Sequence, residues 1–220
     1  MIKKIEIMGI QLDNYTVQEA MEQVEAYLEN TVMNTIGSVT METLVQAKEN
    51  GDIKAGIKEL DLAIVEDQEI LKAAGANSPQ RLKETAEQQF FQEFLRRTAQ
   101  EGRTVYLFGK TMEQLEGVKR QLLEYDSGLS ILGGFAMEEC GEDYESAVNE
   151  VNSILPDIIL SVLPSPGQEY FLRVNKGKMN AKIWYGLGSG FGRQHNGLKG
   201  LVKKIIHKEM LRSMRCKGEN

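Results

Sequence analysis

The strongest signal for the fold is the segment DIILSVLPSPGQEYFLRVNKGKMNAKIWYGLGSGFG, residues 157–192. Residues 157–163 are almost continuously apolar, which is typical of a strand that is buried on both faces. A helix is predicted at 168–176, and a second strand at 182–187 runs into a glycine-rich loop. A strand, a helix and a further strand in this order predict a βαβ unit with parallel strands.

The same alternation of strands and helices extends back to the N-terminus. Further strands are predicted at 5–10, 32–36, 60–65, 104–108 and 129–132, with helices in between. The pattern predicts an α/β fold with a mostly parallel sheet and helices on both faces. We divide the chain into one domain, residues 1–197, and a C-terminal appendage, residues 198–220.

Helix starts and turns can be placed from single residues. Thr16 with Glu19 forms a capping box, and Ser78 followed by Pro79 opens a helix that is predicted to continue to about residue 100. The small residues 37–38 predict a loop between the second strand and the helix after it.

Composition and charge exclude several classes of protein. The chain has 220 residues, of which 41% are apolar and 26% charged, and its net charge is −6. These values are ordinary for a soluble globular protein, and the acidic balance argues against a nucleic-acid partner. No apolar run approaches the roughly 18 residues of a membrane span. The first ten residues contain only a broken apolar stretch, which predicts a strand and not a signal peptide.

The two cysteines, Cys140 and Cys216, have no metal-type spacing and predict free thiols in a reducing cytosol. His195 and His207 have no partner cluster, so a zinc site is not expected. We therefore expect a cytoplasmic protein without a metal or a cofactor. The sequence leaves the oligomeric state open, a homo-oligomer included.

The C-terminus is basic although the rest of the chain is acidic. Residues 199–217 carry seven Lys or Arg and one Glu, which leaves the remainder at −12. A helix is predicted at 199–215, with apolar residues on one side and basic residues, Arg212 and Arg215 among them, on the other. Such a helix can lie on an anionic membrane or hold a diphosphate. The alternative is a helix that packs on the body with a solvated basic face.

Loops that follow strands are the places to search for a site, because ligands of open α/β sheets bind beyond the carboxyl ends of the strands. The loop 186–192 holds glycines at 186, 188, 190 and 192, whose backbone amides could approach a phosphate. Its spacing is not the dinucleotide fingerprint, which weighs against a dehydrogenase. The alternative is a tight strand-to-helix turn. The GKT at 109–111 lacks the glycine at 104 that a phosphate loop of an ATPase needs.

Three polar side chains stand at such loops. Asp67 follows an apolar strand and could act as a general base, or complement a helix dipole as a first-turn acid. Gln168 and Glu169 open a helix behind two prolines, and the glutamine amide could bind a sugar or a phosphate. The alternative is a solvated glutamine beside an ordinary first-turn acid.

The order of these motifs resembles the TagA/WecG/CpsF family of bacterial glycosyltransferases over nearly the whole chain. The most specific match is ILSVLPSPGQEYF, residues 159–171, which is similar to the family's Pro-x-Gln-Glu motif. The other resembling segments are IEIMGIQLDNYTVQEAMEQV (5–24), SVTMETLVQAKEN (38–50), LAIVEDQEIL (62–71), SPQRL (78–82), RTVYLFGK (103–110) and IWYGLGSGFG (183–192).

The resemblance implies a Rossmann-like glycosyltransferase with a basic C-terminal appendage. The family transfers a sugar, typically N-acetylmannosamine, from UDP to an acceptor sugar on undecaprenyl diphosphate, with inversion and without an obligatory metal. Asp67 falls on the family's catalytic base, Gln168 on its motif glutamine and Arg81 on an arginine expected near the diphosphate. Ser38 and Thr40 fall on its Thr-x-Asn loop, and Glu169, Gly186, Gly188, Gly190, Arg212 and Arg215 complete the expected substrate-binding residues.

Several positions differ from the family pattern. Thr40 replaces an asparagine, Gln68 a glycine and Gly192 an aspartate, and Glu84 and Ala86 stand where the family has glycine and aspartate. These differences support an alternative hypothesis, in which the chain is a catalytically impaired relative that binds UDP-sugar or lipid diphosphate as a regulator or scaffold.

Overall fold

The computed structural model describes residues 3–139, 144–188 and 191. Its strands are β1 (Lys4–Ile7), β2 (Ile10–Asp13), β3 (Asn34–Val39), β4 (Leu62–Val65), β5 (Thr104–Gly109), β6 (Ser130–Ala136), β7 (Ile158–Ser161) and β8 (Ile183–Gly186). Its α-helices are α1 (Val17–Glu29), α2 (Met41–Glu49), α3 (Gly51–Lys58), α4 (Gln68–Ala73), α5 (Pro79–Ala86), α6 (Gln89–Gln100), α7 (Met112–Tyr125), α8 (Glu145–Ile154) and α9 (Gly167–Asn175). Short 3₁₀ turns cover Met137–Glu139 and Lys176–Lys178.

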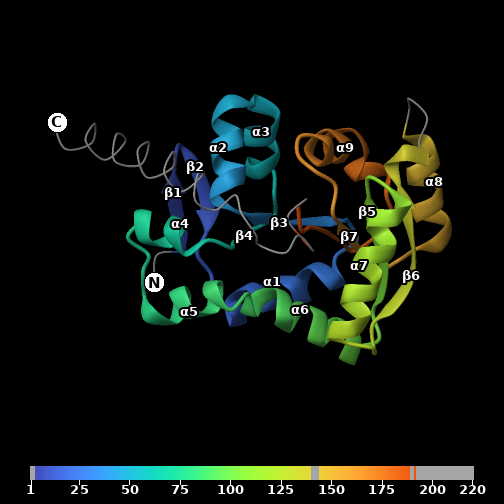
Figure 1. The fold of residues 1–220 in the computed structure, drawn as a ribbon, viewed down its shortest axis with the longest axis horizontal. Helices are drawn as coiled ribbons and strands as arrows, with labels where there is room; N and C mark the ends of the chain where they lie inside the picture. The colour runs from blue at the N-terminus through green and yellow to red at the C-terminus, as the bar shows by residue number, and fades with distance from the viewer. Residues whose placement is uncertain (1–2, 140–143, 189–190, 192–220) are drawn as a thin grey trace.

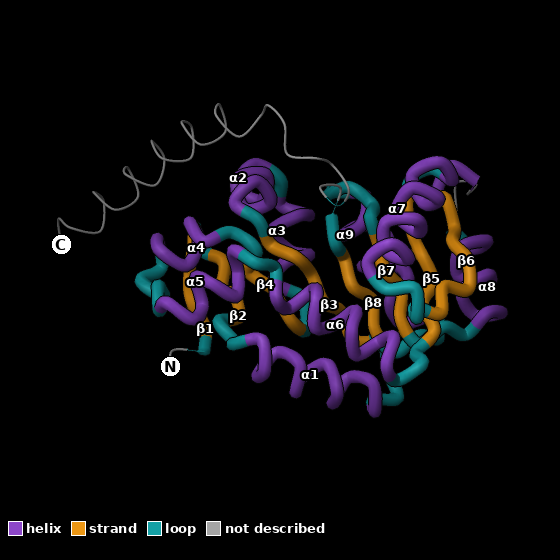
Figure 2. The backbone as a smooth tube through the Cα atoms, turned by 60° about the horizontal axis from the view of Figure 1, so that its bottom comes forward, coloured by secondary structure: helices purple, strands orange, loops and turns teal. Residues whose placement is uncertain are grey.

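The predicted parallel sheet is confirmed. Six strands lie in the order β4-β3-β8-β7-β5-β6, and every neighbouring pair is parallel. Helices cover both faces, with α1 and α6 on one face and α2, α3 and α9 on the other (Figures 1 and 2). This arrangement is Rossmann-like, and it places the βαβ unit of β7, α9 and β8 at the centre of the sheet.

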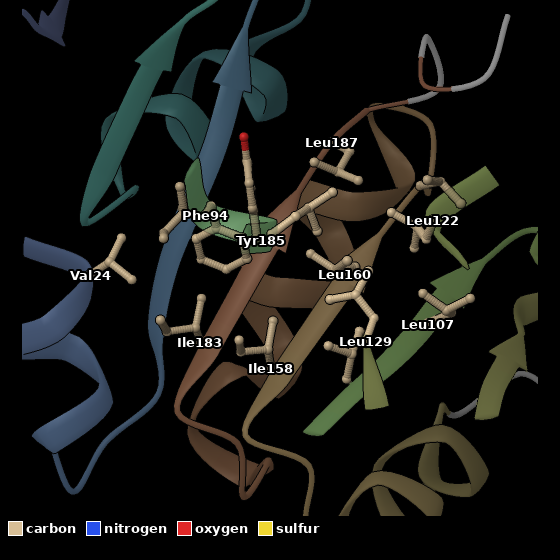
Figure 3. Close-up of a cluster of buried hydrophobic side chains, with 14 of the residues drawn as sticks. Val24, Phe94, Leu107, Leu122, Leu129, Ile158, Leu160, Ile183, Tyr185 and Leu187 are labelled. Carbon is tan, nitrogen blue, oxygen red and sulfur yellow. The ribbon is translucent and has the colours of Figure 1, made fainter. Parts of the chain in front are cut away.

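Three apolar clusters hold the layers together. The largest joins α1, α6 and α7 to the sheet through residues such as Phe94, Leu107 and Tyr185 (Figure 3). A second lies under α2, α3 and α4, and a third packs α8 and α9 around Trp184. Because side chains alternate along a strand, Trp184 and Tyr185 serve opposite faces of the same strand. The central strands are thus buried on both faces, as their continuous apolar runs predict.

Local signals at the start of helices are also confirmed. The hydroxyl of Thr16 accepts a hydrogen bond from the amide of Glu19, whose carboxylate bonds back to the Thr16 amide. Ser78 caps α5, which has proline at its first turn. Such side chains satisfy amides that have no partner inside the helix.

The prediction of one strand at 5–10 is wrong. The segment folds as the antiparallel hairpin β1–β2, outside the parallel sheet, and Ile7 pairs with Ile10. Met8 and Gly9 make the turn with positive φ angles of 52° and 71°. A two-residue turn of this kind reverses the chain, and the hairpin covers the second apolar cluster.

Two further boundaries differ from the prediction. The helix predicted from 78 to about 100 is two helices, α5 and α6, because Gln88 adopts a left-handed conformation with φ 52°. Gly37 and Ser38 belong to β3 and not to a loop, because β4 and β8 pair with that strand along both edges. The predicted helix at 199–215 lies outside the described residues.

Candidate active site at the carboxyl edge of the sheet

The strand order brings the candidate loops to one edge of the sheet. β4, β3, β8 and β7 are consecutive neighbours, so the segments that follow them leave from adjacent positions. Neighbouring strands lie about 4.8 Å apart, which puts the ends of β4 and β8 roughly 10 Å from one another. Asp67, Thr40, Gly188 and Gln168, which are far apart in the sequence, therefore stand along one short edge.

Asp67 binds the start of a neighbouring helix. Its Oδ2 atom accepts a hydrogen bond of 2.6 Å from the backbone amide of Met41, the first residue of α2. Asp67 is also the residue before α4, although its side chain does not cap that helix. The carboxylate thus lies at the positive end of the α2 dipole, while Oδ1 has no hydrogen-bond partner within residues 3–139, 144–188 and 191.

Thr40 caps the same helix. Its hydroxyl accepts a hydrogen bond of 3.1 Å from the amide of Thr43 and lies 2.9 Å from the Thr43 hydroxyl. The N-terminus of α2 is therefore held by two side chains, Thr40 from its own segment and Asp67 from the end of β4.

Glu66, Ser38 and Tyr185 form a row across three neighbouring strands. Ser38 Oγ donates to Glu66 Oε1 over 2.5 Å and lies 3.3 Å from the Tyr185 hydroxyl. Burial raises the pKa of Glu66, and the charge of Asp67 raises it further, while the Ser38 hydrogen bond opposes the shift. Burial also raises the pKa of Tyr185 well above its usual value.

Gln168 lies directly on the last strand. A Cβ at Gly186 would be 2.5 Å from Gln168 Nε2, so only glycine there lets the amide lie against β8. The Oε1 atom of Gln168 is buried and finds no hydrogen-bond partner among the described residues. A buried acceptor without a partner is costly, and it marks a place where a ligand could donate a hydrogen bond.

Glu169 packs where α9 meets α3. A Cβ at Gly56 would be 2.3 Å from its Cγ atom, so the two helices approach closely there. Its Oε1 atom accepts a hydrogen bond of 2.6 Å from the Ser165 hydroxyl, whereas Oε2 is buried without a partner in the described part of the chain.

After β8 the backbone continues to Gly188, whose φ of 71° favours glycine.

Arg81 is engaged inside the protein. Its side chain is 7% exposed, Nη1 pairs with Glu84 Oε2 at 2.7 Å, and Nε donates to Asn14 Oδ1 at 3.2 Å. Arg81 and Glu84, together with Glu66, line a small pocket between β4, α1 and α5. The structure thus places Arg81 next to the site, with its guanidinium held by Glu84.

Some predicted site residues lie outside the described residues. These are Gly190, Gly192, Arg212 and Arg215. The sequence analysis singled out neither Glu66 nor Tyr185. Because side chains alternate along a strand, Tyr185 lies on the same face of β8 as Ile183, which packs in the first apolar cluster.

The fold defines a class of protein: Rossmann-like α/β proteins, a class whose ligands commonly bind beyond the carboxyl ends of the parallel strands. The particular family follows from comparison with known families. Residues 5–194 match the glycosyl transferase WecG/TagA/CpsF family, and the chain belongs to that family. It is thus a glycosyltransferase-family protein of cell-envelope polysaccharide synthesis. No curated protein matches the chain. Within the described residues, none of the helices has the length and apolarity needed to span a membrane.

Proposed function

We propose that this protein transfers a sugar, N-acetylmannosamine or a close relative, from a UDP-sugar to an acceptor on undecaprenyl diphosphate. The observation that carries the proposal is the strand order β4-β3-β8-β7, because Asp67, Gly188 and Gln168 follow strands of this run and so lie along one edge of the sheet. The family match supports the transferase chemistry, and a polymer such as teichoic acid is the product class that the resemblance implies.

Asp67 is the general base in this proposal. Its carboxylate takes the proton of the acceptor hydroxyl as the oxygen attacks the anomeric carbon. The bond to the UDP oxygen breaks with its electron pair, and the configuration at the anomeric carbon inverts. The Met41 amide holds Oδ2, which leaves Oδ1 as the atom that receives the proton.

The other residues of the edge bind substrate. Gln168 offers an Oε1 acceptor beside Gly186 that is unpaired among the described residues, and the backbone at Gly188 could approach a phosphate. Ser38 contributes a partly buried hydroxyl next to Glu66. Arg81 supports this region through its ion pair with Glu84, close to Glu66 in the same pocket.

A transfer assay tests this function. Purified protein is incubated with radiolabelled UDP-N-acetylmannosamine and a lipid diphosphate that carries N-acetylglucosamine, and labelled lipid is measured. Label in the lipid supports the proposal. If the wild-type protein forms no product over a panel of UDP-sugars, or if Asp67→Asn turns over unchanged, the catalytic proposal is wrong.

One observation favours the second candidate, an impaired relative that binds without turnover. The Asp67 carboxylate already accepts a hydrogen bond from the Met41 amide of α2. In addition, Thr40 before Met41 replaces the family's asparagine, and Gln68 after Asp67 replaces its glycine. Calorimetry separates the two candidates. Binding of UDP without turnover on any sugar favours the regulator or scaffold, and absent binding contradicts both.

We further propose that the protein acts at the cytoplasmic face of the membrane as a peripheral protein. The support is the charge of residues 199–217, which carry seven Lys or Arg and one Glu on an otherwise acidic chain. Lys and Arg near an anionic lipid surface contribute about 1 kcal/mol each to binding.

A further inference from the structure

The row of Glu66, Ser38 and Tyr185 is fixed from both ends. Ser38 sits on β3, between the end of β4 and strand β8, and its hydroxyl contacts a side chain from each neighbour. Glu66 also lines the pocket that Arg81 and Glu84 share. The row therefore reaches from that pocket to the centre of the sheet edge.

The packing of Tyr185 fixes the position of its hydroxyl. The ring is fully buried and meets Phe90 and Phe94 edge-on, with centroids 5.9 Å and 5.2 Å away. Figure 3 shows the ring among the core side chains and its oxygen directed toward the carboxyl ends of the strands. Burial raises the pKa of Tyr185 well above its usual value, so the phenol stays protonated and can donate a hydrogen bond.

The directions of the hydrogen bonds follow from the number of protons. Ser38 has one proton and two lone pairs, and its proton is directed to Glu66 over 2.5 Å when Glu66 is ionised. The contact of 3.3 Å with Tyr185 must then use the phenol proton and one lone pair of Ser38. One lone pair of Ser38 remains, on a side chain that is only partly buried.

We propose that Glu66 and Tyr185 are positioning residues that make Ser38 a fixed hydrogen-bond acceptor for the substrate. Ser38 then selects a donor group, which is a hydroxyl or an amide N–H of the sugar nucleotide. This inference rests on the proposed function, because it takes the bound ligand to be a UDP-sugar. Glu66 and Tyr185 act through Ser38, so their effects should disappear when the serine hydroxyl is removed.

A second buried tyrosine, Tyr106, provides a matched control for the Tyr185→Phe variant. Tyr106 on β5 is 1% exposed, and its hydroxyl donates directly to Glu150 Oε1 over 2.5 Å. This pair lies between β5 and α8, on the opposite face from Tyr185. Tyr106→Phe therefore removes the same atom from a similar environment away from the sheet edge.

Isothermal titration calorimetry with UDP and with UDP-N-acetylmannosamine tests the inference. We expect Tyr185→Phe and Glu66→Ala each to weaken binding about tenfold, and Glu66→Gln to stay within about threefold of wild type, because its amide oxygen can still accept from Ser38. Tyr106→Phe should bind as wild type does. Tyr185→Phe keeps the ring packing, so it decides the matter if Glu66→Ala does not fold.

Double variants separate positioning from general damage. In a Ser38→Ala background, Tyr185→Phe and Glu66→Ala should cost no further affinity. Losses confined to UDP-N-acetylmannosamine place the contact on the sugar, and equal losses for both ligands place it on the nucleotide, and either result supports the inference. Additive losses, or wild-type affinity in Tyr185→Phe, overturn it while the proposed function stands. If the wild-type protein binds neither ligand, the proposed function itself fails.

Discussion

The carboxylate of Asp67 holds the first backbone amide of α2, because its Oδ2 atom accepts a hydrogen bond of 2.6 Å from Met41. This bond joins the end of β4 to the helix that follows the neighbouring strand β3. It fixes one carboxylate oxygen, Oδ2. The other, Oδ1, has no hydrogen-bond partner among the described residues and could bind a substrate. A single aspartate can thus serve the fold and the reaction, and suitable variants separate these roles.

We expect Asp67→Asn to lower turnover by a factor of about 10² or more, because an amide cannot accept the acceptor's proton. Binding of UDP should persist, since the asparagine oxygen can still accept from Met41. Asp67→Ala should in addition lose about 1 kcal/mol of unfolding free energy with the hydrogen bond. Single-turnover kinetics and urea denaturation measure the two effects. Equal stability of the two variants would mean that the Met41 contact contributes nothing to the fold.

The ion pair of Arg81 and Glu84 should matter more for stability than a surface pair. Their side chains are 7% and 9% exposed, so Arg81→Ala removes the opposite charge from a buried carboxylate and leaves it only the hydrogen bonds from Gln80 and the Val17 amide. Such a loss costs about 3–5 kcal/mol. The control is Arg96→Ala, which breaks the solvent-exposed pair with Glu93 and should cost much less than Arg81→Ala. Denaturant titrations that rank the two variants equally would contradict the structural role of Arg81.

Gly186 should tolerate no side chain without a cost in binding. A Cβ there would lie 2.5 Å from the Gln168 amide, which must then leave β8. We expect Gly186→Ala to weaken binding of UDP-N-acetylmannosamine about tenfold with a modest change in stability, because only a side chain has to move. Gly117→Ala, in open space on α7, should leave binding unchanged and stabilise the helix by roughly 0.5–1 kcal/mol. Unchanged affinity in Gly186→Ala would argue against a ligand contact of Gln168.

The stability of the protein should depend on pH through Glu66. Burial raises the pKa of Glu66, so folding takes up a proton at this carboxyl. Protonated Glu66 therefore contributes its full share of the free energy of unfolding below the ordinary pKa of about 4.3. This stabilisation is lost as pH rises through the pKa of Glu66 in the folded protein. We expect Glu66→Gln to gain unfolding free energy relative to wild type as pH increases. Urea titrations from about pH 4 to 8 measure the difference.

Glu93 provides a control of opposite sign. Its hydrogen bond with Arg96, followed by that with Arg97, lowers its pKa to about 2. Ionised Glu93 stabilises the protein above its ordinary pKa, and this stabilisation is lost as pH falls toward about 2. Glu93→Gln should therefore be less stable than the wild type near neutral pH, and the difference should vanish at low pH. If the difference in unfolding free energy between Glu66→Gln and the wild type does not change with pH, the Glu66 carboxyl has the same pKa in the folded and unfolded protein, and the prediction is wrong.

Membrane association should depend on the basic C-terminus. We expect the full-length protein to float with vesicles that contain phosphatidylserine, and added salt to weaken this binding by screening. Replacing Lys203, Lys204, Lys208 and Arg212 by glutamine should abolish flotation. The control is neutral phosphatidylcholine vesicles, which should recover little of either protein. Equal recovery of the charge-neutralised variant would remove the proposed membrane role of this segment.

The class of fold and the places where a site could form can be predicted from the order of the amino acids. Continuous apolar runs such as 157–163 can only be buried on both faces, and their alternation with amphipathic helices leaves a parallel sheet as the solution. Capping residues such as Thr16 and Ser78 set helix starts because their hydrogen bonds are local. The family of the chain was also apparent from its motifs, of which residues 159–171 are the most specific.

Which side chains meet could not be predicted in this way, because it depends on how the strands and helices pack. The hairpin at Met8 and Gly9 and the helix break at Gln88 depend on positive φ angles that nothing in the local apolar pattern requires. The bond from Met41 to Asp67 and the row of Glu66, Ser38 and Tyr185 depend on strand order, which brings β4, β3 and β8 together. Periodicity shows the face on which a side chain lies, but neighbours across strands are chosen by the packing of the whole sheet.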